Sequence, residues 1–247
     1  MTAVFVHGNP ETPAVWGPLR SELSRTDVVA VHLPGFGIPT PEGFSATKES
    51  YVDWLIAELE TYDHPVDLVG HDWGGGLVGR VACLRPDLIR SWAIDVAGIF
   101  HEDYVWHEFA QIWQKDGEGE AFFEHQIGTP RAERIARFNA MGIAGDVAES
   151  FADAGGAEMA RCVLALYRSA AQPALREWGA DAAKARAKPG LVLAAENDHF
   201  VGGRTLAHAM AERMGAVAVD LPEVGHWWML QDPKLGAATL ETFWRSV

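Results

Sequence analysis

The sequence contains few cysteines, few basic residues and no long hydrophobic segment. Among its 247 residues, Cys83 and Cys162 are the only cysteines, and their isolation matches neither a metal site nor a redox motif. Lys and Arg number 20 against 34 Asp and Glu, so the net charge is -14, and no basic cluster occurs. We therefore expect buried thiols in a reducing, cytoplasmic environment, with neither nucleic acid nor an anionic membrane as a partner.

No apolar run approaches the length needed to span a membrane. The apolar start, Thr2–Val6, is too short for a signal peptide. What is present is the composition of a folded domain, with 48% hydrophobic and 22% charged residues. Length and composition fit one large α/β domain with an insertion, or two small domains, with an ample core.

A tight turn between an apolar strand and a helix is the most informative stretch. Val66–Val69 is a predicted strand, and Gly70–Gly74 is the turn that follows it. A helical pattern then runs to Arg85 and stops at Pro86. The glycines suit a turn too tight for side chains, which lifts Asp72 above the carboxyl edge of the sheet. The helix N-terminus favours a negative charge there. Asp72 is therefore either the cap of an ordinary helix or a nucleophile that attacks carbon and forms an ester.

The sequence Gly-His-Asp-Trp-Gly of this turn resembles the nucleophile elbow of the α/β-hydrolase-fold epoxide hydrolases and haloalkane dehalogenases. A second motif, His7–Pro10, resembles the H-G-x-P loop after the third strand of that fold. The resemblance implies a hydrolase core of residues 1–98 and 189–247, with a helical cap, residues 99–188, inserted after the fourth strand. The chain has no room for the usual N-terminal hairpin. We therefore expect a parallel sheet of about six strands in the order 2-1-3-4-5-6. The predicted strands begin near Val4, Val28, Asp67, Trp92, Leu191 and Val217, and the clearest predicted helices cover 14–25, 203–214 and 233–245.

Three residues occur in the order of nucleophile, acid and base in this fold: Asp72, Asp198 and His226. Asp198 follows a predicted strand, and His226 lies in a Gly-His-Trp context that resembles the family's histidine loop. The resemblance implies that Asp72 forms an ester, that His226 activates the water that hydrolyses it, and that Asp198 fixes the imidazole tautomer. Glu196 and Asp95 are the alternative acids.

The leaving group needs hydrogen-bond donors, and the sequence offers two sets. The backbone N–H groups of Asn9 and Trp73 are expected to form an oxyanion hole. In the dehalogenases that this stretch resembles, an Asn and a Trp in these places donate N–H bonds to the leaving halide. Epoxide hydrolases generally use two cap tyrosines. Leu166–Arg168 resembles the context of the later one, Tyr167, whereas the earlier one is not evident.

The predicted substrate pocket is formed by aromatic residues and histidine near the missing tyrosine and beside the predicted base: Trp106, His107, Phe109, Trp113 and Trp227. Trp106, His107 and Trp113 are candidate donors to an epoxide oxygen, although an indole N–H does not readily release its proton. Packing in the cap core is the alternative role of Trp106, Phe109 and Trp113. These residues suggest a small apolar substrate, and the resemblance implies neither a metal nor a cofactor.

The leading hypothesis is a hydrolase that converts an epoxide to a vicinal diol, and a haloalkane dehalogenase is the second. A haloacid dehalogenase would carry an Arg after the nucleophile to clamp a carboxylate, which Trp73 cannot do. A serine esterase is disfavoured because Asp72 occupies the nucleophile position. A catalytically inactive binding protein of the same fold is the alternative outside enzymes. Without the hairpin, Val28–Val31 becomes a sheet edge, and homodimer formation is one way to cover it.

Overall fold

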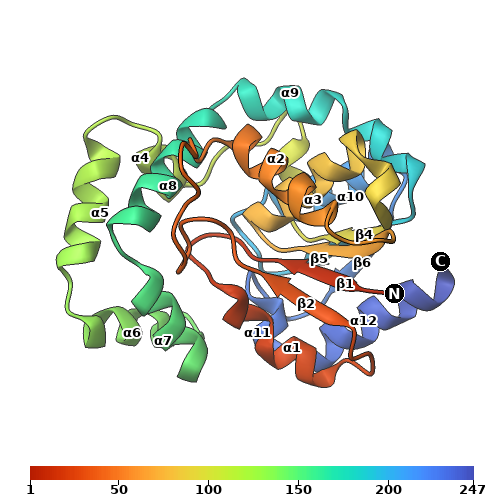
Figure 1. The fold of residues 1–247 in the computed structure, drawn as a ribbon, viewed down its shortest axis with the longest axis horizontal. Helices are drawn as coiled ribbons and strands as arrows, with labels where there is room; N and C mark the ends of the chain where they lie inside the picture. Colours follow the sequence, from red (N-terminus) through yellow and green to blue (C-terminus); the bar gives the residue numbers. More distant parts are fainter.

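The computed structural model describes all 247 residues and is built on one six-stranded sheet (Figure 1). Every pairing is parallel, and the strand order is β2-β1-β3-β4-β5-β6. The strands are β1 Ala3–Val6, β2 Val28–Val31, β3 Val66–Gly70, β4 Ile89–Ile94, β5 Gly190–Ala195 and β6 Val217–Leu221. The six parallel strands and their order were both predicted from the sequence and are confirmed.

Helices cover both faces of the sheet, because each strand presents alternate residues to opposite sides. In β1, Val4 and Val6 join one hydrophobic cluster, while Ala3 and Phe5 join a second. The first cluster lies under α2 Lys48–Leu59, α3 Trp73–Leu84 and α10 Gly203–Met214. The second lies under α1 Gly17–Glu22, α11 Trp228–Gln231 and α12 Pro233–Ser246.

The insertion after β4 forms a helical layer beyond the carboxyl ends of the strands, at the left of Figure 1. Its helices are α4 Glu108–Trp113, α5 Glu118–Gly128, α6 Arg131–Ala140, α7 Gly145–Ala154 and α8 Ala157–Ser169. The chain then returns along the core through α9 Ala174–Ala180 and the 3-10 segment η4 Ala182–Ala187. η4 packs against α3 and α10, and α9 packs against the 3-10 segment η3 Ala97–Phe100. The last part of the segment 99–188 therefore lies on the α/β core, and α4 to α8 cover the carboxyl ends of the strands.

The helix predicted over residues 14–25 is instead two short elements. A 3-10 turn, η1 Pro13–Trp16, precedes α1, and Leu23 is already extended. The helix starts again at Gly17 because Pro18 has no N–H to continue the earlier turn and is tolerated only in a first turn. Another short 3-10 turn, η2 Pro86–Leu88, follows α3 at the predicted stop. No helix combines the length and the apolar character needed to cross a bilayer.

Candidate active site

Asp72 occupies a strained turn between β3 and α3. Its φ of 50° and ψ of -126° lie outside the regions that most residues adopt. A Cβ atom at Gly74 would overlap the backbone carbonyl of Val6, and one at Gly70 would overlap the carbonyl of Gly74. The close approach of β1, β3 and α3 thus requires glycine on both sides. It holds Asp72 at the carboxyl edge of the sheet, where the sequence motif predicted it.

The two carboxylate oxygens of Asp72 have different surroundings. Oδ1 accepts a hydrogen bond of 2.8 Å from the backbone N–H of Asn9. Oδ2 lies 3.7 Å from Nε2 of His226, which is beyond hydrogen-bond length. The backbone N–H of Trp73 makes no hydrogen bond to either oxygen. One oxygen is therefore held by a donor, and the other is free to react.

His226 is oriented by Asp198 and not by either alternative acid. Its Nδ1 lies 2.8 Å from Oδ2 of Asp198, whose other oxygen accepts the N–H of Phe200 at 2.9 Å. Glu196 is exposed and accepts the N–H of Glu223 instead. Burial alone would lower the pKa of His226, but the charge of Asp198, its hydrogen bond to the ring and the charge of Asp72 together raise the pKa above its ordinary value. Burial acts to raise the pKa of Asp198, and the ion pair with His226 brings it below its ordinary value.

Asp95, the remaining alternative acid, belongs to a buried network beneath the site. It directly follows β4, which ends at Ile94, and its carboxylate contacts His71 at 2.5 Å. The same carboxylate accepts the backbone N–H of Asp72 at 3.2 Å and the indole N–H of Trp228 at 2.7 Å. Asp95 therefore supports the elbow from below.

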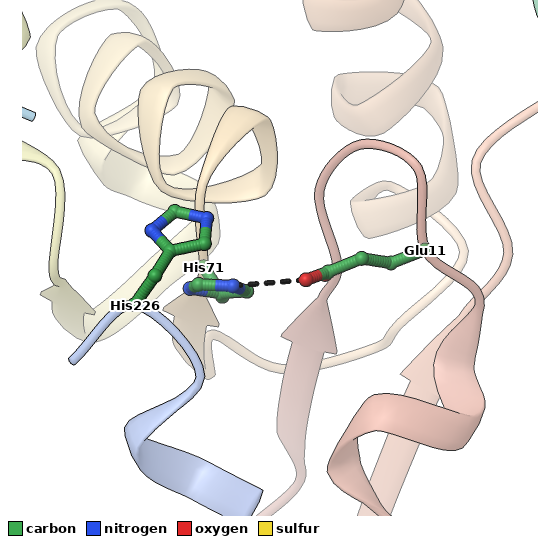
Figure 2. Close-up of side chains that lie close together, drawn as sticks. All are labelled: Glu11, His71 and His226. Carbon is green, nitrogen blue, oxygen red and sulfur yellow. Dashed lines mark ion pairs between the residues drawn. The ribbon is translucent and has the colours of Figure 1, made fainter. Parts of the chain in front are cut away.

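His71 is fully buried between two carboxylates, and Figure 2 shows its ring beneath that of His226 with Glu11 on the other side. Its Nε2 lies 3.0 Å from Glu11, an ion pair without hydrogen-bond alignment, while its Nδ1 faces Asp95. Burial opposes protonation, but the charges of Asp95 and Glu11 raise the pKa of His71 well above its ordinary value. His71 is thus an imidazolium buried under the site.

This buried cation influences the reacting groups above it. The rings of His71 and His226 are 4.6 Å apart. Burial raises the pKa of Asp72 above its ordinary value, and the charges of His226 and His71 oppose that rise. The charge of His71 also opposes protonation of His226. His71 therefore favours a carboxylate at position 72 and restrains the basicity of the neighbouring imidazole.

Glu11, His71 and His226 bring potential metal ligands within 4.8 Å of one another. Their donor atoms do not fit an ion, because both nitrogens of His71 already face carboxylates and a protonated imidazole has no free lone pair. Glu11 is also occupied, accepting the N–H of Gly8 at 2.9 Å and the indole N–H of Trp227 at 2.8 Å. The cluster is thus a closed hydrogen-bonded support.

A cavity of about 250 Å³ lies between the elbow and the cap. Asp72, His226 and Asn9 reach it from the core. Five of the predicted cap and pocket residues also line it: His107, Phe109, Trp113, Tyr167 and Trp227. Trp106 and Trp73 do not belong to the lining and stack on each other, with ring centroids 5.9 Å apart. The indole N–H of Trp106 donates to the carbonyl of Ala170, so that residue acts in packing.

Tyr167 is buried on α8 and takes part in the cavity wall. Burial raises the pKa of its hydroxyl well above the ordinary value, and the charge of Asp72 adds to the rise. Hydrogen bonding by the side chains of Asn9 and Trp73 acts to lower the pKa of the same hydroxyl. The amide of Asn9 is buried with neither polar atom hydrogen-bonded. Several hydrogen-bond donors that the fold does not use therefore lie near Asp72.

His107 begins α4, and its Nδ1 accepts the backbone N–H of Ala110 at 3.2 Å. Burial and the charge of His226 lower the pKa of His107 to about 4, so its ring is neutral at pH 7. Since Nδ1 accepts, the proton of the neutral ring is on Nε2. His107 can therefore donate one hydrogen bond inside the cavity wall.

Sequence reasoning missed Glu11 and two cavity residues of α6, Arg134 and Arg137. Glu11 directly follows the His7–Pro10 loop, which was the available signal. The arginines lie three residues apart and are followed by Phe138 and Met141, which also line the cavity. This i, i+3, i+4, i+7 spacing marks one helix face, but nothing in the sequence indicates that the face looks toward Asp72.

A parallel sheet that carries a strained turn residue to its carboxyl edge, under a helical insertion, is the architecture of the α/β hydrolase fold. A model of the Alpha/beta hydrolase family matches residues 3–239, and the chain belongs to that family. The haloalkane dehalogenase DbeA-M1 loop variant from Bradyrhizobium elkanii has the same fold. Its structure superposes with a TM-score of 0.73 over 99% of this chain and 89% of that chain, at 18% identity.

Relatives with assigned activities match shorter stretches. (E)-2-((N-methylformamido)methylene)succinate hydrolase of Acinetobacter baylyi is 29% identical over 107 residues, covering 42% of this chain and 40% of the relative. Epoxide hydrolase 4 of Mus musculus is 35% identical over 96 residues, covering 36% of this chain and 26% of the relative. The chain thus matches less than half the length of either relative, and these similarities leave the activity to be argued from the site.

Proposed function

We propose that this chain is a hydrolase that acts through a covalent ester of Asp72, with an epoxide as substrate and a vicinal diol as product. The observation that carries the proposal is the arrangement of Asp72, His226 and Asp198. A free carboxylate oxygen faces the cavity, and an imidazole held by a second carboxylate lies 3.7 Å away. A serine-type reaction is excluded by the aspartate at the elbow.

In the first step, Oδ2 of Asp72 attacks a ring carbon of the epoxide and the carbon–oxygen bond breaks. Oδ1, which accepts the Asn9 N–H, becomes the carbonyl oxygen of the ester. In the second step, Nε2 of His226 takes a proton from water, and the hydroxide attacks the ester carbonyl carbon. The Asn9 N–H stabilises the oxyanion. Asp198 stabilises the imidazolium meanwhile. Collapse breaks the bond between the carbonyl carbon and the substrate-bound oxygen, and the two protons of the water, one of them delivered by the imidazolium, end on the two hydroxyls of the diol. His226 is then neutral and Asp72 is again a carboxylate.

The epoxide assignment is supported by donors on the cap side of the cavity. The alkoxide formed in the first step must be hydrogen-bonded or protonated as it leaves the carbon. Tyr167 carries a hydroxyl whose raised pKa keeps it protonated at neutral pH. His107 contributes a neutral imidazole N–H to the same cavity. His107 would take the place of the second tyrosine that the sequence lacks.

A haloalkane dehalogenase is the second candidate because of Asn9. Its buried amide has no hydrogen-bond partner, and leaving such a group unpaired costs about 1–3 kcal/mol. A halide that leaves the carbon would accept a hydrogen bond from this amide, which lines the cavity. The binding-protein hypothesis is the remaining alternative and predicts no covalent chemistry.

A trapping experiment distinguishes the three candidates. Attack by Asp72 consumes no base, so His226→Gln should form the ester and then stall. Intact-protein mass spectrometry should show an increase equal to the whole mass of an epoxide, because ring opening expels nothing. A haloalkane would add only its alkyl group. The adduct should map to a peptide that contains Asp72.

Asp72→Ala is the matched control and should carry no adduct from either panel. Labelling by haloalkanes but not epoxides would replace the epoxide assignment with the dehalogenase one. If folded His226→Gln acquires no label from either panel, the ester mechanism is wrong for these substrates and the binding-protein hypothesis gains support.

A further inference from the structure

The cavity above Asp72 has a charged wall that the proposed reaction does not use. α6 presents Arg134 and Arg137 to it, one helical turn apart on the same face as Phe138 and Met141. Like charges at this spacing repel each other by a few tenths of a kcal/mol in an isolated helix. Arg134 is partly buried and Arg137 is exposed, so solvent can offset this repulsion, and what distinguishes the pair is its place in the cavity wall.

Neither arginine has an acidic partner within the chain. Nη1 of Arg134 donates to the carbonyl of Gly155 at 2.7 Å, and Nη1 of Arg137 donates to the side chain of Gln126 at 2.9 Å. Both acceptors are uncharged, and Nε of Arg134 is buried with no partner at all. These two cations remain without an ion pair in a chain that has 34 acidic residues and a net charge of -14.

Arg131 shows what the same helix does with a structural arginine. It lies outside the cavity and pairs with both Glu149 and Asp153. α6 thus begins with an ion-paired arginine outside the cavity and then carries two arginines without ion pairs that line it. Asp153 lies close enough to feel the charge of Arg134, but its carboxylate is engaged by Arg131.

The rest of the wall decides what kind of anion would fit. Apart from the arginines and the Asp72–His226 pair, the lining is mostly hydrophobic and includes Phe122, Phe151 and Met159. The cavity therefore combines a reactive part, an apolar part and a cationic part, and α6 lies apart from the sheet in Figure 1. Guanidinium groups recognise carboxylates by paired, charge-assisted hydrogen bonds.

We propose that Arg134 and Arg137 bind the carboxylate of an apolar-chain acid whose other end carries the carbon attacked by Asp72. The identification as substrate rests on the proposed function, whereas the carboxylate site itself does not. At roughly 30 Å³ per water-sized group, the cavity of about 250 Å³ accommodates a chain of about eight carbons. This replaces the expectation of a wholly apolar substrate.

A matched pair of epoxides tests the substrate class. 7,8-Epoxyoctanoate and 7,8-epoxyoctanamide differ only in the charge at the far end. We expect kcat/KM for the acid to exceed that for the amide by about tenfold to a hundredfold, the size of one or two charge-assisted hydrogen bonds. In the double variant R134Q/R137Q this preference should fall at least tenfold. Arg131→Gln, on the same helix, should retain it.

Binding of octanoate, which has no reactive carbon, separates this proposal from the proposed function. Calorimetric titration should show octanoate binding that is lost in R134Q/R137Q and kept in Arg131→Gln, with octanamide binding weakly throughout. Octanoate binding without any epoxide turnover would leave the carboxylate site standing and contradict the proposed reaction. Turnover of both epoxides at equal kcat/KM, with no octanoate binding, would overturn the carboxylate site. Circular dichroism checks that the variants fold, which is expected because α6 buries no residue.

Discussion

Tyr167 is the residue on which the choice between the two leading chemistries depends. It lies in the cavity wall, and the side chains of Asn9 and Trp73 act to lower the pKa of its hydroxyl. An epoxide oxygen and a halide would draw on different members of this group. The alkoxide needs a donor that can give up a proton, and neither an amide nor an indole N–H does this readily. The phenol is therefore needed for one reaction and dispensable for the other.

Replacing Tyr167 with Phe should lower epoxide turnover by about one to three orders of magnitude, the usual effect of losing a general acid or oxyanion donor. The change removes one oxygen and keeps the ring that contacts Trp113 at a centroid distance of 4.8 Å. Steady-state rates with epoxide and haloalkane panels measure the effect. Equal epoxide rates for Tyr167→Phe and the unaltered chain would show that another group, such as His107, supplies the donor.

At the residue scale, local motifs predicted the positions that depend on local backbone. The elbow residue follows from the glycine spacing, and Asp198 and His226 follow from strand ends and chain order. The role of Asp95 was not predictable, because its contact with His71 joins the residues that follow β3 and β4, and the sequence does not show how these two strands align. Glu11 was missed for the same reason. A buried ion pair leaves no periodic pattern in either partner's surroundings.

At the element scale, the cap helices are anchored very unequally. α8 buries residues along its length: Met159, Ala160, Cys162, Val163, Leu164, Leu166 and Tyr167. α6 buries none, although it supplies three residues of the cavity wall. Opening free energies within one protein follow such differences in buried contacts. α6 is therefore the element best placed to move when a ligand enters.

Amide hydrogen exchange should be at least about a hundredfold faster in α6 than in α8, a difference of about 2.7 kcal/mol in opening free energy. Mass spectrometry of deuterated peptides resolves the two helices. Octanoate at saturating concentration should slow exchange in α6 selectively if Arg134 and Arg137 hold its carboxylate. Equal protection of α6 and α8 without ligand would show that the cap moves, if at all, as one piece.

Elements with strong terminal signals were predicted more closely than the cap. α10 and β6 have the predicted bounds, because glycines flank the helix and apolar residues mark the strand. The segment over 14–25 failed where Gly17 and Pro18 interrupt the helical pattern. In the cap, hydrophobic periodicity indicates helices but not which face meets the core, so the orientation of α6 required the structure.

At the scale of the whole molecule, the cap and the hydrolase core share their hydrophobic packing. The larger cluster joins core residues such as Leu68 and Leu77 to cap residues such as Val163 and Leu166. The smaller cluster reaches from Phe5 across to cap residues in α7. Continuous packing of this kind favours a single cooperative unfolding transition, so one free energy of unfolding describes the molecule. The buried charges beneath the site then contribute to the stability of the whole chain.

The free energy of unfolding should be highest near pH 6.5 and should fall on either side. On the acid side, His7 and His107 have pKa values lowered to about 4 in the folded state, so stability is lost as pH falls from about 6.5 toward 4. His71 and His226 have raised pKa values in the folded state, so their stabilisation is complete below about 6.5 and is lost as pH rises through the folded values. Glu11, with a pKa of about 2, contributes stability above about 4.3 that is lost as pH falls toward 2, and the lowered pKa of Asp198 acts in the same sense. The raised pKa of Asp72 opposes this acid arm and makes it shallower.

Urea unfolding measured from pH 4 to 9 tests the alkaline arm most directly. As pH rises, each histidine that is protonated only in the folded state lowers the free energy of unfolding by about 1.4 kcal/mol for every pH unit. His71→Gln should make the alkaline slope shallower by the part that His71 contributes. Glu11→Gln keeps the imidazole of His71 paired with Asp95 and should also make the slope shallower. The control is His125→Gln, at an exposed histidine without an ion pair, and it should leave the slope unchanged. An alkaline slope as steep in both His71→Gln and Glu11→Gln as in the unaltered chain would show that the histidine beneath the site is not an imidazolium in the folded protein.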